Sequence, residues 1–319
     1  MTEVTAVITG GEAVCQILAV LLNDLTRNEA GARASQDTEY LHSYRVAIRR
    51  ARVVTGQFSG VLPVAAAEYF SSEFRWLGQS SGPLRDADTY LLEFKNHLAW
   101  LPETVRPHAR QFQDYLILKQ IIEQEKFVSV LSDPRYHLFI AYWRAFTAKG
   151  HADWNARAWA LYEEIWSEKI WRLYRRMVRK GRLIGPDSPA AKLHELRKDG
   201  KKLRYLIEFY DQVSSMQETA KTSPPLRHLR RLQNILGAHQ DYDVQSGAIN
   251  EFFELYFKGV QASNNTSLAL GILIGQLGAR QALIREKFES CFKAFSGKRS
   301  KREFRVLCAT QQAKPDAVT

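Results

Sequence analysis

Two segments far apart in the sequence carry rows of basic side chains at helical spacing. The first row begins at His42 and continues through Arg45, Arg49 and Arg52 at intervals of three and four residues. At about 100° per residue, these side chains lie within one quadrant of an α-helix. Arginine binds phosphate oxygens through its planar guanidinium group, lysine through a mobile point charge, and histidine through a ring N–H. A helix with such a row therefore has the chemistry to bind a chain of phosphates.

The second row occurs in residues 193–210, which repeat residues 41–58 without gaps. The earlier segment reads LHSYRVAIRRARVVTGQF and the later one reads LHELRKDGKKLRYLIEFY. Each segment therefore predicts a helix with the same basic face. The basic residues of the two rows, with one neighbour beside each row, are His42, Arg45, Arg49, Arg50 and Arg52, and His194, Arg197, Lys201, Lys202 and Arg204.

Few acidic residues are available to neutralise these rows. Residues 41–58 contain no Asp or Glu, and in the second segment we place Glu195, Asp199 and Glu208 outside the basic quadrant. The usual explanation of a single basic helix face is that it is solvated or pairs with carboxylates one turn away. Because like charges one turn apart repel each other, and because the pattern occurs twice, we favour an anionic ligand that compensates both rows.

A third basic row is predicted in the segment IWRLYRRMVRKGR. Arg172, Arg175, Arg176 and Arg179 follow the spacing i, i+3, i+4 and i+7. This row supports phosphate binding, and we include Arg175 and Arg179 among the candidate binding residues. The alternative, an amphipathic helix whose outer face is only solvated, stays open.

A second repeated block follows each of the first two rows. RWLGQSSGPLRDAD at residues 75–88 matches RRLQNILGAHQDYD at residues 230–243. Arg75 falls on Arg230, and both blocks end in an Asp-x-Asp pair. Two repeated blocks in the same order indicate an internal duplication, with the two halves meeting between about residues 132 and 155.

The Asp-x-Asp pairs admit two roles. They could hold a divalent metal ion, as carboxylates do in phosphoryl-transfer enzymes. They could instead cap the helices that begin there and orient arginine side chains from behind. Each pair closely follows a glycine at a predicted helix start, so we favour capping and orientation and predict no metal site. The four carboxylates are Asp86, Asp88, Asp241 and Asp243.

The overall composition agrees with an anionic partner and offers little support for an enzyme. The 319 residues include 45 Lys and Arg against 34 Asp and Glu, a formal net charge of +11. A surface this basic attracts polyanions such as nucleic acid, phosphorylated ligands or an anionic membrane, and the charge alone does not choose among them. The sequence contains no GxxxxGK(S/T), HExxH or GxSxG motif, and we predict neither catalysis nor a cofactor.

The cysteines indicate the compartment of the protein, and the N-terminal segment indicates whether it spans a membrane. The three cysteines have neither metal-ligand nor disulfide spacing, which favours a reducing compartment and hence the cytoplasm. The apolar run from Val14 to Leu22 is too short for a membrane span and lacks the basic flank of a signal peptide. We therefore expect no membrane span.

The hydrophobic pattern predicts an all-α fold. Periods of three and four residues dominate, strand signals are scarce, and clusters of proline and glycine separate the helices. Residues 296–319 are basic and then polar, and we expect a frayed tail. The predicted helices cover about residues 11–28, 37–58, 64–81, 84–99, 104–131, 134–148, 155–181, 190–213, 224–237, 239–259 and 265–295.

These segments resemble a CHAD domain, an all-helical module named for its histidines. The resemblance spans about residues 10–295. It implies two four-helix-type bundles related by a pseudo-twofold axis, at about residues 10–131 and 155–295, joined by a helix at about 133–150. It also implies that the basic rows face each other across a cleft or central pore. The matching segments are LHSYRVAIRRAR, LRDAD, SDPRYHLFIAYWRAF, RRMVRKGR, LHELRKDGKKLRYLIEFY and LRRLQNILGAHQDYD.

The CHAD family is associated with binding inorganic polyphosphate and often accompanies a triphosphate-processing CYTH domain. No ExExK signature of that partner occurs in this sequence, which therefore resembles a stand-alone CHAD protein. The resemblance implies polyphosphate binding by the basic residues of the first two rows, together with Arg75 and Arg230.

We therefore expect non-catalytic binding of inorganic polyphosphate, and association with polyphosphate or storage granules in the cytoplasm would follow from it. Two alternatives stay open: an all-α metal-dependent phosphohydrolase that uses the Asp-x-Asp pairs, and a non-specific nucleic-acid-binding module. We expect nucleic acid less than polyphosphate, because no nucleic-acid-reading motif or interleaved aromatic surface accompanies the rows.

Overall fold

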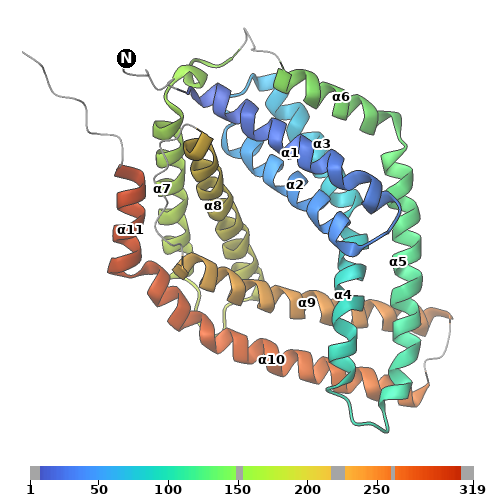
Figure 1. The fold of residues 1–319 in the computed structure, drawn as a ribbon. Helices are drawn as coiled ribbons and strands as arrows, with labels where there is room; N and C mark the ends of the chain where they lie inside the picture. The colour runs from blue at the N-terminus through green and yellow to red at the C-terminus, as the bar shows by residue number, and fades with distance from the viewer. Residues whose placement is uncertain (1–7, 149–153, 217–226, 260–262, 310–319) are drawn as a thin grey trace, which may run out of the picture.

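The computed structural model describes residues 8–148, 154–216, 227–259 and 263–309 (Figure 1). Within these residues the regular elements are helices, and an isolated bridge between Thr9 and Leu161 is the one β-type pairing. The predicted all-α fold is confirmed.

The first half of the chain forms helices close to the predicted positions. Asp37 caps the helix that carries the first basic row, because its side chain accepts a hydrogen bond of 2.9 Å from the Glu39 N–H. The elements are α1 (Gly10–Arg33), α2 (Thr38–Gln57), α3 (Val64–Ser80), α4 (Gly82–Leu98), the 3₁₀ helix η1 (Arg106–Ala109), α5 (Arg110–Leu131) and α6 (Pro134–Ala148).

The second half also consists of helices, and it differs from the prediction at two places. Its elements are the 3₁₀ helix η2 (Ala156–Trp159), α7 (Tyr162–Gly181), α8 (Ala190–Met216), α9 (Arg227–Gly259), α10 (Asn264–Ser296) and α11 (Lys298–Ala309).

The two differences concern α9 and the predicted tail. A break near Ala238 was predicted, but α9 is continuous, because Gly237 costs a helix only about 1 kcal/mol and α9 packs along α10. The frayed tail is wrong for residues 298–309, which form α11 because Phe304 and Leu307 bury their side chains in the core. Residues 310–319 lie outside the described residues.

The helices are arranged along four sides of a ring-like outline (Figure 1). One side is formed by α1, α2 and α3, the next by α7 and α8, the third by α9 and α10, and the fourth by α4 and α5. Contacts between α2 and α8 join the first two sides. The two helices that carry the predicted basic rows are therefore neighbours.

Two hydrophobic cores hold this arrangement, and each contains side chains from both predicted halves. In the larger core, Phe58 after α2 stacks on Trp166 of α7, with ring centroids 3.7 Å apart. In the smaller core, Phe112 of α5 packs edge-on against Phe252 of α9 at 5.3 Å. Because both cores are shared and close-packed, they set the position of α2 relative to α8.

One helix of the described part has the length and apolar composition of a membrane span. By length and composition alone, α10 could cross a membrane. A single such helix is weak support for a span, because core helices of soluble proteins can have the same length and composition.

Candidate anion-binding site between α2 and α8

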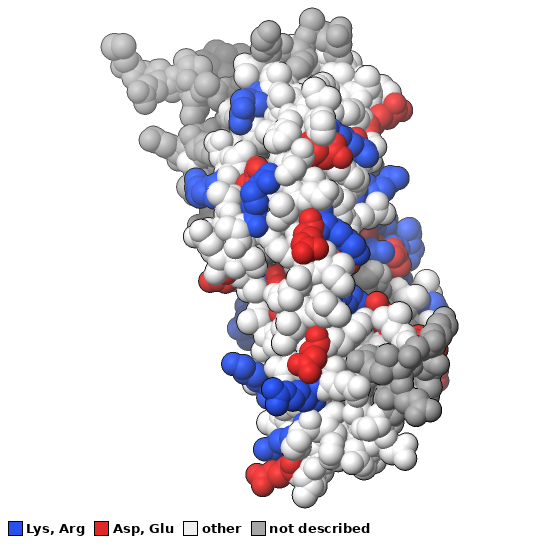
Figure 2. All heavy atoms as spheres, turned by 90° about the vertical axis from the view of Figure 1, so that its right-hand side faces the viewer, with Lys and Arg blue, Asp and Glu red and all other residues white. Residues whose placement is uncertain are grey.

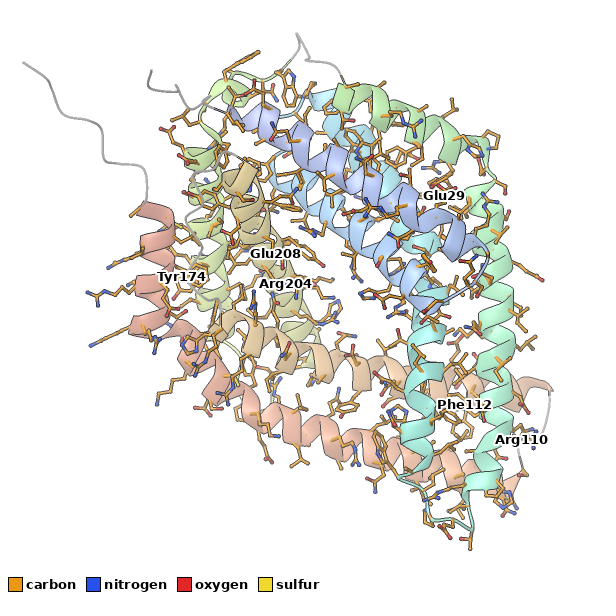
Figure 3. All side chains as sticks on the ribbon, in the orientation of Figure 1. Glu29, Arg110, Phe112, Tyr174, Arg204 and Glu208 are labelled. Atoms are coloured by element: carbon orange, nitrogen blue, oxygen red, sulfur yellow. The ribbon has the colours of Figure 1, made fainter. Side chains whose placement is uncertain are left out.

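The basic rows of α2 and α8 lie next to each other. Nη2 of Arg50 on α2 is 3.9 Å from Oε2 of Glu208 on α8, and the Arg50 guanidinium carbon is 4.8 Å from the centre of the Phe209 ring. Figure 3 shows Arg204 and Glu208 on the side of α8 that faces α2. We call the basic residues that meet here the α2–α8 cluster: His42, Arg45, Arg49, Arg50, Arg197, Lys201 and Arg204.

The pKa of Lys201 shows how closely the positive charges of this cluster approach one another. Burial, followed by the guanidinium groups of Arg197 and Arg49, lowers the pKa of Lys201 from 10.5 to about 7. The carboxylate of Asp241 opposes this change without cancelling it. The cluster therefore holds more positive charge than the neighbouring carboxylates compensate.

His42 experiences the same positive field from α2, α4 and α8. Burial lowers its pKa, and the charges of Arg85, Arg49 and Lys201 act in the same direction. Arg85 was not among the predicted site residues. Its Nη1 donates a hydrogen bond of 3.2 Å to the Thr38 carbonyl oxygen at the start of α2, so α4 adds a cation to the cluster. In the sequence its one signal is its place in LRDAD, directly before Asp86.

Arg45 and Arg197 occupy equivalent positions of the two rows and have different partners. Nη1 of Arg45 donates hydrogen bonds to the Gly78 carbonyl oxygen at 3.1 Å and to the Ser81 Oγ at 2.7 Å. Nη2 of Arg197 is instead 3.7 Å from Oδ1 of Asp241. Burial lowers the pKa of both guanidinium groups, that of Arg45 to about 10, so both are cations at neutral pH. The hydrogen bonds of Arg45 hold α2 against the α3–α4 junction.

The guanidinium groups of the cluster are incompletely hydrogen-bonded. In the described structure, the buried Nε atoms of five cluster arginines have no hydrogen-bond partner, whereas nearly all buried polar groups in proteins have one. Two of these side chains also lie over aromatic rings: Arg50 over Phe209, and Arg204 over Tyr205 at 5.3 Å from the ring centre. The five residues are Arg45, Arg49, Arg50, Arg197 and Arg204.

Besides Arg197, which approaches Asp241, two further residues of the second segment have a carboxylate partner, contrary to the prediction. Nε of Arg204 is 3.3 Å from Oε1 of Glu208, which lies one helical turn later and therefore on the basic face. Nζ of Lys202 is 3.9 Å from Oδ1 of Asp199, which lies on the α7 side of α8. The expectation that no carboxylate neutralises the rows is therefore wrong for Arg197, Lys202 and Arg204. It is also wrong for Arg50 beside the first row, which lies 3.9 Å from Glu208.

Asp199 is a buried carboxylate that joins α8 to α7. Its side chain is 4% exposed, and its oxygens accept hydrogen bonds from Nη2 of Arg176 at 2.7 Å and from Nζ of Lys180 at 2.9 Å. Gly200 follows it, and a Cβ there would lie 3.3 Å from the Met177 side chain and 3.5 Å from that of Gln233. This glycine therefore lets α7 and α9 approach α8 closely.

The predicted capping role of the Asp-x-Asp pairs is wrong. Ser81 precedes α4 without a side-chain capping bond, and Asp241 and Asp243 lie in the interior of α9. Asp88 is buried and accepts a 2.6 Å hydrogen bond from Nε2 of Gln120 on α5. The orienting role agrees with the contact between Asp241 and Arg197.

Asp86 and Asp241 bring negative charge to the edge of the cluster. Partial burial raises the pKa of both carboxyl groups, and the Asp241 side chain is still 51% exposed to water. The charge of Asp241 raises the pKa of Asp86 further. In the ranges that the structure describes, no group of three or more His, Cys, Asp or Glu residues could hold a metal ion.

The remaining predicted residues lie at the rim of this region or apart from it. His194 forms a hydrogen bond through Nδ1 with Oε1 of Gln240, which joins α8 to α9. Arg52, Arg75 and Arg230 are exposed, and within the described part of the chain no hydrogen bond or ion pair joins their side chains to the cluster. On the α5 side of the molecule, acidic and basic side chains are intermixed (Figure 2).

The third predicted row separates into two parts. Arg172 pairs with Glu168 and Arg176 with Asp199, so these two charges are compensated within α7 and by α8. Arg175 and Arg179 are exposed and line a pocket between α7 and α11. The prediction that they join the first two rows is not supported, because the α11 side and the α8 side of α7 are different faces.

Comparisons with known proteins agree with this architecture. The CHAD domain family model matches residues 16–250. The crystal structure of the CHAD domain from the plant Ricinus communis superposes with a TM-score of 0.69 at 22% identity, covering 91% of this chain and 93% of that one. PptA from Streptomyces chartreusis superposes with a TM-score of 0.70 at 15% identity, covering 89% and 99%. A comparison with curated proteins finds no match. At these identities the two structures establish the fold.

Proposed function

The chain belongs to the CHAD domain family, and we propose that it binds inorganic polyphosphate at the α2–α8 cluster without hydrolysing it. The family is associated with polyphosphate, and this association directs the choice of anion. Binding in the cytoplasm, with association to polyphosphate granules, is part of the same proposal.

The depressed pKa of Lys201 is the observation that carries the proposal. A lysine whose pKa is lowered by burial and by two arginines gains stability when an anion enters beside it. Folding alone gives no reason to assemble such a group from two distant segments. A bound polyanion gives one, because its charge offsets the repulsion between Arg49 and Lys201.

The extent of the cluster favours a chain of phosphates over a single one. Along α8 the basic side chains of Arg197, Lys201 and Arg204 extend over about 10 Å by the helical rise. Arg49 and Arg50 of α2 add cations beside them, so successive phosphates of one chain have separate partners. Because polyanion binding releases counterions, raising the salt from about 50 to about 200 mM should weaken binding by a factor of about 10³ or more if six phosphates are contacted.

The test is a pair of double variants compared at pH 6, below the pKa of about 7 of Lys201, so that both lose nearly the same charge. Arg49→Gln/Lys201→Gln removes two cations of the cluster, and we expect affinity for long-chain polyphosphate to fall by at least about tenfold. Arg144→Gln/Lys198→Gln removes two cations elsewhere and should bind nearly as the unchanged protein does. Titration of labelled polyphosphate at fixed salt measures both. Equal affinity of the two double variants would overturn the assignment of the site.

Competition distinguishes polyphosphate from nucleic acid. Polyphosphate should displace bound DNA or RNA at equal phosphate concentration, because a narrow row of guanidinium groups fits a bare phosphate chain better than one separated by sugars and bases. Displacement in the opposite direction would favour the nucleic-acid alternative.

A further inference from the structure

A second basic region lies between α7 and α11, apart from the α2–α8 cluster. It lines a pocket of about 650 Å³, a size typical of sites for small ligands. Trp171 and Tyr174 form part of the wall. Five basic side chains also line it: Arg175, Arg179 and Arg182 from α7 and its end, and Lys301 and Arg305 from α11.

These five cations lack the carboxylates that neutralise their neighbours on the same helices. Within the described residues, no carboxylate lies within ion-pair distance of any of them, whereas Arg172 pairs with Glu168 and Arg299 pairs with Glu303 at 3.2 Å. The contrast is local, since each helix carries both kinds of basic residue. The pocket is therefore lined by five cations without a carboxylate partner, although Lys298 and Arg302 of α11 also lack an ion pair in the described structure and lie outside the pocket.

Helix geometry explains why the five side chains converge. Arg175, Arg179 and Arg182 are spaced i, i+4 and i+7 and share one face of α7. Lys301 and Arg305 are spaced i, i+4 on α11, and Phe304, which lies about 60–100° away around the same helix, stacks on Tyr174 with ring centroids 4.1 Å apart. The apolar contact between the helices thus fixes two basic edges on the same side.

We propose that this pocket binds a short oligophosphate group, carried by a nucleotide or present as free inorganic tripolyphosphate. Guanidinium groups at one-turn spacing can each contact a separate phosphate. The half-buried Trp171 ring lies at the end of the α7 row, one turn before Arg175, where the base of a nucleotide would stack. The size of the pocket excludes a folded macromolecule and a long polymer as its complete ligand.

The site is independent of the α2–α8 cluster. Arg176 and Lys180, on the other side of α7, are held by Asp199 of α8 and separate the two basic regions. Binding to the pocket is therefore measured in the Arg49→Gln/Lys201→Gln protein, in which the first site is weakened. If the α2–α8 cluster does not bind polyphosphate, binding of ligands to the α7–α11 pocket can still be measured in this protein.

The experiment titrates ATP, tripolyphosphate and AMP into this protein by calorimetry. We expect ATP and tripolyphosphate to bind with a stoichiometry of one and AMP to bind at least about tenfold more weakly, because it offers one phosphate. Further substitution of Arg175→Gln and Lys301→Gln should lower the affinity by at least about tenfold. The matched pair Arg172→Gln and Arg299→Gln makes the same charge change on the same helices and should leave it unchanged.

Comparing the affinities for ATP and tripolyphosphate also identifies the source of the phosphates. Tighter binding of ATP than of tripolyphosphate, reduced by Trp171→Leu, would assign the nucleotide, and equal or weaker binding of ATP would assign the inorganic chain. The proposal is overturned if neither ligand binds, or if the Arg175/Lys301 and Arg172/Arg299 pairs of substitutions have equal effects.

Discussion

Arg49 of α2 lies close enough to Lys201 of α8 for its charge to lower the pKa of the lysine. These two residues occupy the same position of the repeated segments LHSYRVAIRRAR and LHELRKDGKKLR. Asp86 and Asp241, which are equivalent in the second repeated block, also interact. Equivalent residues contact each other where a twofold axis passes between two copies. The arrangement is the one that an internal duplication predicts, and it brings like charges together at the site.

The first prediction concerns the pH dependence of polyphosphate binding. A bound anion raises the pKa of Lys201, which is about 7 in the free protein, so binding takes up a proton at higher pH. Affinity should therefore be nearly constant just below pH 7 and fall as pH rises above 7, by at most about tenfold per unit for one proton. Calorimetry at pH 8 in buffers of different ionisation enthalpy should detect the proton uptake.

A matched variant isolates this effect. In Lys201→Arg the side chain remains charged across the whole range, so the loss of affinity above pH 7 should be much smaller. If the unchanged protein and Lys201→Arg have parallel pH profiles, Lys201 does not contact the anion. Acidification below pH 7 should strengthen binding further through His42, whose pKa is lowered in the free protein.

The second prediction is that the cluster lowers the stability of the free protein. Because the pKa of Lys201 is lower in the folded than in the unfolded state, the charged form opposes folding. The cost is complete below pH 7 and disappears as pH rises toward the ordinary lysine pKa. Lys201→Met should therefore raise the free energy of unfolding by about 1 kcal/mol at pH 6 and by less at pH 9.

Urea unfolding of both proteins at the two pH values measures this difference. Lys198→Met, at an exposed position of the same helix, serves as the control and should change stability little at either pH. A destabilised Lys201→Met at pH 6 would contradict the prediction, because it would mean that the lysine stabilises the fold.

Much of this site follows from local spacing, which the sequence displays directly. The basic face of α2 depends on the intervals between His42, Arg45 and Arg49, and a helix orients such residues in the same way in any fold. The helix starting at Pro134 is likewise a local property, since proline is favoured in the first turn. The all-α fold and the basic face of each helix were predictable for this reason, whereas the approach of the two rows was expected only from the resemblance to CHAD domains.

The remaining features depend on which face of a helix another helix covers. Arg175 and Arg176 are adjacent in the sequence, yet one faces the α11 pocket and the other pairs with Asp199 of α8. The surroundings of these two side chains differ because α11 packs against one face of α7. α11 is held there by the stacking of Phe304 on Tyr174. The contribution of Arg85 similarly requires the position of α4 beside α2, which no repeat in the sequence specifies.

The third prediction concerns Asp199, the buried link between α7 and α8. Asp199→Asn removes the charge that holds Arg176 and Lys180, and a neutral amide cannot accept all of their hydrogen bonds. We expect the free energy of unfolding to fall by about 1–3 kcal/mol, because the partners can still turn partly to water. Glu195→Gln breaks only the exposed pair with Lys198 and should cost at most about 0.5 kcal/mol. Equal effects in thermal unfolding would show that the Asp199 contacts are not stabilising.

The last prediction separates a binding site from a hydrolytic one. Asp86 and Asp241 place negative charge beside cations that we assign to phosphate, so both repel the ligand, although Asp241 also orients Arg197. In a binding protein, Asp86→Asn/Asp241→Asn should therefore raise affinity for polyphosphate by a factor of about 2–10, since each exposed charge interaction contributes up to about 1 kcal/mol. Phosphate release with Mg²⁺ or Mn²⁺ should stay at background in both proteins. A metal-dependent hydrolase predicts the reverse: release above background in the unchanged protein, and its loss in the double variant. Asp114→Asn, on the exposed surface of α5, is the control for a change of charge alone.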